Sequence, residues 1–130
     1  MELREVNSVL ENVYSDLSKG KIDRMLGFFV ENVVLEWGPF SFRGREGVRK
    51  WGGELRQMFT QLAFKLNEPS IQGNTATQSL SINITAPNGR RGLIRATADY
   101  EFEEKKIKHI KINILEGILV VRKQELPSQQ

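Results

Sequence analysis

Few side chains in this sequence have the type and spacing that chemistry at a site requires. The chain contains no cysteine, which excludes disulfides, thiolate metal sites and a cysteine nucleophile. Its one histidine, His109, alternates with Ile110 and is expected to face solvent or an interface. With one histidine and no cysteine, we expect neither a conventional metal site nor a bound cofactor.

Carboxylate and phenol groups remain as candidates for acid–base chemistry. The candidate catalytic residues are Asp99, Tyr14 and Glu54, the last of which follows Trp51 by three positions. None has a partner at a spacing that requires catalysis. Further polar residues that could orient a ligand are Glu36, Arg43 and Arg95.

Apolar and aromatic residues form a larger set, which could line a pocket. Trp37 and Trp51 suit stacking on a flat hydrophobic ligand, although ordinary core is the alternative for most of the set. The predicted ligand-binding residues are Trp37, Phe40, Trp51, Leu55, Phe59, Tyr100 and Ile112.

Three helices are expected to position these residues. Apolar residues at helical spacing predict helices over residues 2–18 and Ile22–Phe29, and a long helix over Arg45–Leu62. The long helix has an inner stripe of Val48, Trp51, Leu55, Met58, Phe59 and Leu62. Gly52-Gly53 inside it indicates either close packing against a strand or room for a ligand.

In the remaining segments, apolar and polar residues alternate with the period of two that is typical of strands. Val33–Trp37 and Phe40–Arg43 are expected to pair across Gly38-Pro39, and Phe64–Asn67 forms a short strand. Longer strands are predicted over 75–86 and 93–103, and a last strand places Ile110, Ile112 and Ile114 on one face. Helices followed by strands predict an α+β fold in a single domain, residues 1–126, with 127–130 a frayed tail.

Composition limits the partners and the compartment. The net charge is +3, with scattered lysines and arginines and no interleaved aromatics, so nucleic-acid binding is not expected. The longest apolar run, 117–121, is too short to span a bilayer, and the charged start does not resemble a signal peptide. We therefore expect a cytoplasmic protein.

Three segments carry a family resemblance: LSKGKID at 17–23, FVENVVLEW at 29–37 and FRGREGVRKW at 42–51. In this order they resemble the nuclear transport factor 2-like superfamily, in particular its SnoaL-like and ketosteroid-isomerase-like branch, over about Val6 to Glu116. The resemblance implies a cone, in which a curved antiparallel sheet wraps around the long helix and leaves an apolar pocket at its open end.

The catalytic residues of known relatives are mostly replaced here. The positions of the ketosteroid isomerase base, tyrosine and protonated aspartate correspond to Trp37, Val13 and Ala98. Tyr14 lies about 100° further around its helix and is expected to aim elsewhere. Asp99 is expected on the polar face with Thr97, unless a gap in the following turn directs it to the pocket.

Two other sets of catalytic residues are also missing. Limonene-epoxide hydrolases need acidic and basic residues where 75–86 has none, and an aspartate near Ile112. Scytalone-dehydratase-like proteins rely on pocket histidines, and His109 is expected to face outward.

These comparisons favour a protein that binds a small apolar molecule. A cofactor-free isomerase, cyclase or dehydratase is the enzymatic version of this hypothesis. The alternative is a non-catalytic interaction module with a filled core. In either case we expect a homodimer, paired through the polar sheet face of Ser79, Ser81, Asn83, Thr97 and Asn113.

Overall fold

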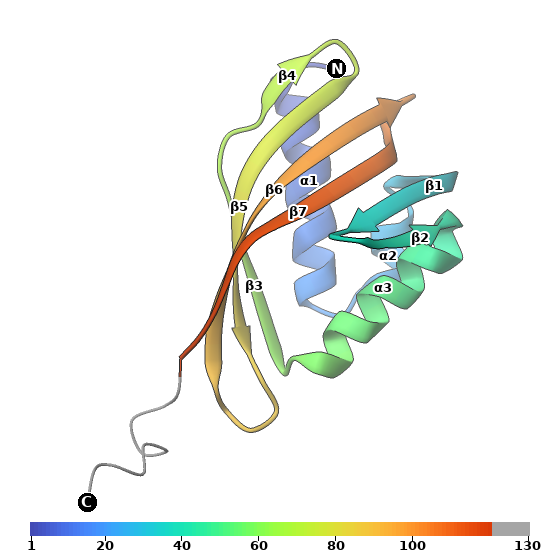
Figure 1. Ribbon diagram of the computed structural model, residues 1–130. Helices are drawn as coiled ribbons and strands as arrows, with labels where there is room; N and C mark the ends of the chain where they lie inside the picture. The colour runs from blue at the N-terminus through green and yellow to red at the C-terminus, as the bar shows by residue number, and fades with distance from the viewer. Residues whose placement is uncertain (121–130) are drawn as a thin grey trace, which may run out of the picture.

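A computed structural model describes residues 1–120, and its helices and strands follow the order expected for an α+β domain (Figure 1). The predicted tail at 127–130 lies outside the described residues. The elements are α1 (Leu3–Ser18), α2 (Ile22–Leu26), β1 (Phe29–Trp37), β2 (Phe40–Arg43), α3 (Gly44–Met58), β3 (Gln61–Leu66), β4 (Ser70–Gln72), β5 (Thr75–Thr85), β6 (Arg91–Glu103) and β7 (Lys106–Val120).

The strands form one curved sheet in the order β2-β1-β7-β6-β5-β3, with β4 paired to β5. Figure 1 shows α1 on the concave side of this sheet, and α3 beside β1 and β2. The curved sheet and its helices confirm the expected fold class. One pair differs from the antiparallel expectation, because β1 and β7 run parallel. These two strands are far apart in the chain, so no hairpin fixes their relative direction.

Helix α2 is shorter than predicted, since it ends at Leu26 and not at Phe29. Phe29 instead begins β1 and pairs with Ile107 of β7. Its carbonyl also accepts hydrogen bonds from Arg45 Nε at 3.0 Å and Nη2 at 2.8 Å. These contacts with distant parts of the chain outweigh the local helical pattern.

The end of the long helix was also predicted wrongly, because α3 stops at Met58. Phe59 has φ −129° and ψ 137°, which is extended backbone. Leu62 is buried in β3, and Met58 is 58% exposed and so does not belong to the inner stripe. The apolar residues Leu62, Phe64 and Leu66 recur with period two, which is the strand pattern. The short strand β4 was not anticipated.

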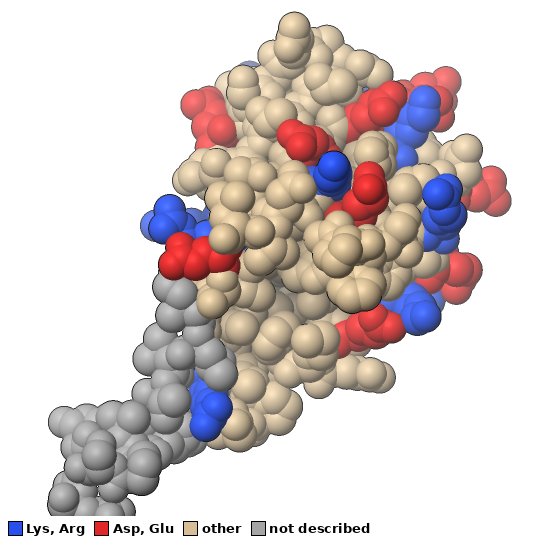
Figure 2. Space-filling model, in the orientation of Figure 1, with Lys and Arg blue, Asp and Glu red and all other residues tan. Residues whose placement is uncertain are grey.

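The core lies between α1, α3 and the concave face of the sheet. The apolar residues at helical spacing in α1 are Leu3, Val6, Val9, Leu10, Val13 and Leu17, and all of them are buried except Leu3, which is 40% exposed. Among residues 1–120, no helix is long and apolar enough to cross a membrane. On the face shown in Figure 2, acidic and basic side chains are interspersed and form no extended patch of one sign.

The two glycines in α3 have different surroundings. A Cβ on Gly52 would lie 3.1 Å from Ile22 Cδ1 and 3.3 Å from Leu17 Cδ1, whereas a Cβ on Gly53 would meet no atom within 4 Å. Gly52 therefore allows close packing, although against α1 and α2 and not against a strand.

We expect Gly53→Ala to raise the free energy of unfolding by about 0.5–1 kcal/mol, because alanine is the better helix former and has space here. Urea unfolding measures the change. Gly52→Ala is the matched control and should gain less, since its methyl group must displace side chains. An equal gain at both positions would contradict this account.

Candidate functional site

A chain of buried hydrogen bonds crosses the interior between α1 and the sheet. The hydroxyl oxygens of Tyr14 on α1 and Tyr100 on β6 are 2.6 Å apart. The Tyr100 hydroxyl donates to Gln78 Oε1 on β5 at 2.8 Å, and Gln78 Nε2 donates to the Asn67 carbonyl at 2.9 Å. Tyr14, Tyr100 and Gln78 are each 5% exposed or less, so water does not replace these bonds.

The direction of this chain follows from its last member. A backbone carbonyl can only accept, so the amide nitrogen of Gln78 must face Asn67 and its oxygen must face Tyr100. Tyr100 therefore uses its one O–H group to donate a hydrogen bond to Gln78, and its oxygen accepts a hydrogen bond from Tyr14. The O–H group of Tyr14 is therefore occupied by a hydrogen bond inside the protein and is not free to donate to a ligand.

Both phenols are held in the protonated form. Burial raises the pKa of Tyr14 above its ordinary value of 10.0, against a smaller lowering effect of the hydrogen bond with Tyr100. Burial also raises the pKa of Tyr100, and the adjacent Tyr14 raises it further. Near neutral pH these groups can form hydrogen bonds, but neither can act as a base.

These raised pKa values predict a loss of stability in alkali. Above pH 10.0 the unfolded chain releases phenol protons that the folded chain keeps, so the free energy of unfolding falls as pH rises. The expected slope is about 1.4 kcal/mol per pH unit for each tyrosine. Urea unfolding at several pH values measures it, and Tyr14→Phe should remove about half of the slope. An unchanged slope in that variant would contradict the prediction.

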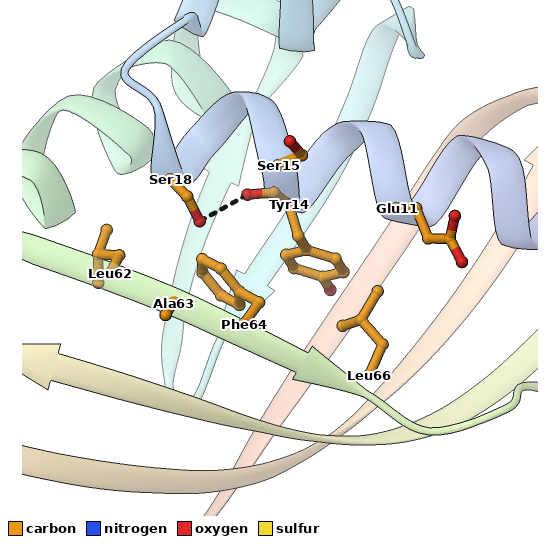
Figure 3. A pocket seen from close by; sticks show the side chains of 8 residues that line it. All are labelled: Glu11, Tyr14, Ser15, Ser18, Leu62, Ala63, Phe64 and Leu66. Atoms are coloured by element: carbon orange, nitrogen blue, oxygen red, sulfur yellow. Dashed lines mark hydrogen bonds between the residues drawn. The ribbon is translucent and has the colours of Figure 1, made fainter.

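A groove of about 470 Å³ runs between α1 and β3 (Figure 3). The ring of Tyr14 forms part of its wall and lies 4.8 Å from the ring of Phe64, measured between centroids. The Ser18 hydroxyl donates to the Tyr14 carbonyl at 2.9 Å. The residues that line the groove are Glu11, Tyr14, Ser15, Ser18, Leu62, Ala63, Phe64 and Leu66.

Tyr14 is one residue beyond the position that matches the ketosteroid isomerase tyrosine, yet its hydroxyl points into the interior. The side chain is 1% exposed and meets Tyr100. Helix α1 buries both Val13 and Tyr14, because the sheet curves around this part of the helix.

Most of the predicted ligand-binding residues lie in the core and not along this groove. Trp51, Leu55, Tyr100 and Ile112 are buried, while Trp37 and Phe59 are partly buried. The Trp37 and Trp51 rings contact each other, with centroids 5.8 Å apart.

Phe40 was predicted to line a pocket, but its side chain is exposed to solvent. It is 64% exposed, since it lies on the edge strand β2 directly after the Gly38-Pro39 turn. Trp37, its pairing partner on β1, is instead covered by the ring of Trp51.

The acidic candidates Asp99 and Glu54 are not brought together with the tyrosines. Asp99 is exposed and faces outward with Thr97, as the alternation predicted, and the adjacent Ala98 is fully buried. Asp99 lines a separate groove of about 390 Å³ on that outer face. Glu54 is exposed on α3.

The remaining polar candidates also lie on the outer surface. His109 Nε2 is 2.6 Å from Glu36 Oε2, a contact that joins β7 to β1. Arg95 forms an ion pair with Glu116 at 3.5 Å, and Arg43 is exposed on β2. Within residues 1–120, no cluster of histidine, aspartate and glutamate could hold a metal ion.

Sequence reasoning missed Gln78 and Glu11. Gln78 has the same parity along β5 as Ala76, Leu80 and Ile82, so it is a polar residue on an apolar face. That interruption is a signal of a buried hydrogen-bonding partner and could have been used. No comparable signal marks Glu11, because an exposed glutamate on a helix is ordinary.

The sequence profile of the SnoaL-like domain matches residues 10–110. The chain belongs to the SnoaL-like family. Among curated protein sequences, none matches this SnoaL-like chain at a significant level.

Solved structures share the fold of this SnoaL-like protein at low sequence identity. SalBIII, an epoxide hydrolase/cyclase-like enzyme of pyran ring formation in the polyether salinomycin, is 18% identical, with TM-score 0.76 and coverage of 89% of this chain and 95% of its own. A nuclear transport factor 2-like protein of unknown function from Burkholderia pseudomallei K96243 is 12% identical, with TM-score 0.77 and coverage of 88% and 92%. TerC, co-crystallised with polyporic acid, is 11% identical, with TM-score 0.75 and coverage of 85% and 91%.

Proposed function

We propose that this SnoaL-like protein binds a small, largely apolar molecule in the groove between α1 and β3. The observation that carries the proposal is the apolar lining of this groove by Phe64 and Leu66, which are only partly buried and so remain accessible to a ligand. A volume of about 470 Å³ lies within the usual range for small-molecule sites. The buried Tyr14 ring, anchored through its hydroxyl to Tyr100, supports Phe64 from the interior side.

The similar structures support this class of function. TerC was crystallised with polyporic acid, which is a small molecule, and SalBIII is described as an enzyme of pyran ring formation. At such low identity these likenesses carry over no ligand and no reaction.

The geometry favours binding over turnover. Both tyrosines stay protonated near neutral pH, because their pKa values are raised. The O–H group of Tyr14 already donates a hydrogen bond to Tyr100. A cofactor-free isomerase, cyclase or dehydratase would be the enzymatic form of the proposal, and Glu11 is the carboxylate that lines the groove. A reaction would need that group, since Asp99 and Glu54 lie elsewhere.

An NMR titration with 2-naphthalenemethanol, a flat apolar alcohol, tests the proposal. We expect the largest chemical-shift changes at the backbone amides of Ser15, Leu62 and Phe64. Ser18→Phe should block the groove and weaken binding about tenfold or more, whereas Ser41→Phe, on the exposed edge strand β2 outside the groove, should leave it unchanged. Shift changes confined to other surfaces, or equal binding by both variants, would overturn the proposal.

A second candidate function is the non-catalytic homodimeric interaction module. It is favoured by Leu115 and Ile114 on β7, which are 66% and 40% exposed next to a bulge opposite Arg95 and Ala96. Exposed apolar side chains on a sheet face are typical of a surface that another molecule covers. Native mass spectrometry should then find a dimer that Leu115→Glu dissociates, and a wild-type monomer would exclude this candidate.

A further inference from the structure

The polar side chains of the α1–β3 groove offer acceptors of hydrogen bonds rather than donors. Glu11 is the ionised side chain among the lining residues, and a carboxylate can only accept. The Ser18 hydroxyl donates its hydrogen bond to the Tyr14 carbonyl, and the Tyr14 hydroxyl donates its own to Tyr100, so neither is free to donate to a ligand. Figure 3 shows the Ser15 hydroxyl directed away from β3.

The backbone along the groove adds groups of both kinds. Strand β3 is an edge of the sheet, and the Asn67 N–H donates to the Ser79 carbonyl of β5. Pairing alternates along an antiparallel ladder, so Leu62, Phe64 and Leu66 direct their backbone groups to the open edge. These groups are neutral and include equal numbers of donors and acceptors, so they do not select the charge of a ligand.

Positive side chains near the groove do not neutralise Glu11. Lys65 alternates with Phe64 and Leu66 along β3 and lines a different groove, on the outer face. Arg56 donates to the Ser18 carbonyl at 2.7 Å, so it lies at the opposite end from Glu11. Seven residues of helix separate these ends, a distance of about 10 Å.

The apolar part of the groove lies beside the same carboxylate. Leu66 is closest to the Glu11 end in Figure 3, followed by the Tyr14 and Phe64 rings. Aromatic rings stabilise a cation that approaches their faces, and they also bury a flat apolar body. Glu11 forms no ion pair within residues 1–120, so an anionic ligand would meet an unneutralised carboxylate there.

We infer that the ligand of this groove is an organic ammonium ion with a flat or apolar body. Its ammonium group donates to the Glu11 carboxylate, and its body packs on Leu66 and Phe64. This inference rests on the proposed function, because it names the ligand class of the same groove.

Three probes with one aromatic body separate the inference from the proposal beneath it. They are 2-naphthylmethylamine, which is cationic at pH 7, the neutral 2-naphthalenemethanol, and the anionic 2-naphthoate. Titrations followed by the Ser15 and Phe64 amide resonances should show the amine binding about threefold to tenfold more tightly than the alcohol, and the carboxylate binding most weakly.

Two matched variants locate the source of this preference. Glu11→Gln should abolish the advantage of the amine over the alcohol. Glu31→Gln removes an exposed carboxylate on β1, outside the groove, and should keep the advantage intact.

Each outcome bears on a different claim. Binding of the alcohol at the groove without preference for the amine would overturn the inference and leave the proposed function standing. An amine preference that survives Glu11→Gln would also overturn it. Failure of all three probes to shift the groove resonances would overturn the proposed function itself.

Discussion

Replacement of Trp51 by alanine is expected to lower the free energy of unfolding by about 3–5 kcal/mol. The Trp51 side chain is 2% exposed on α3, and its ring contacts that of Trp37 on β1. Removal of the indole leaves a cavity between this helix and the strand that it covers, and close-packed surroundings refill such a cavity only in part. Urea unfolding, followed by circular dichroism, measures the loss.

Met58→Ala is the matched control for this substitution. Met58 lies on the same helix but is 58% exposed, so its truncation should change stability by about 0.5 kcal/mol or less. A loss below about 1 kcal/mol in the Trp51 variant would show that the indole is not part of the packed core.

Tyr100→Phe is expected to cost about 2–3 kcal/mol, because it leaves two buried polar groups without a partner. The Gln78 Oε1 atom loses its donor, and the Tyr14 hydroxyl loses its acceptor. Tyr14→Phe removes the donor at the end of the chain, so one lone pair of Tyr100 goes unused and the cost should be about 1 kcal/mol.

The difference between these two variants tests the direction of the hydrogen-bond chain. Urea unfolding of both proteins under the same conditions gives the two values. A larger loss for Tyr14→Phe would mean that the protons run the opposite way. Double replacement by phenylalanine should cost less than the sum of the single changes, since the two groups depend on each other.

The fold was predictable where the local pattern and the tertiary contacts agree. Helix α1 and strand β5 have clean periods of 3.6 and two, and both lie within a residue or two of their predicted limits. The boundary between α3 and β3 was missed because Met58, Phe59 and Leu62 fit a helical stripe as well as a strand. Pairing of β3 with β5 decides between these patterns, and a local window does not contain it.

The candidate site was less predictable than the fold. Tyr14 and Tyr100 are 86 positions apart, and their contact depends on the curvature of the sheet over α1. Residue types identified Tyr14 and Tyr100 as members of candidate sets, but neither their contact nor the role of Gln78 followed from spacing. The outward position of Asp99 was predicted correctly, because strand alternation alone determines it.

The place of β7 between β1 and β6 also has a consequence for biosynthesis. This strand is the last of the described elements to leave the ribosome, yet it joins the β1–β2 hairpin to the rest of the sheet. Until it emerges, Val33 and Leu35 of β1 lack the strand beside which they are buried. Before β7 is made, the β1–β2 hairpin is held to the rest of the domain through helix contacts such as that of Gly52 with Leu17, and the sheet is not yet continuous.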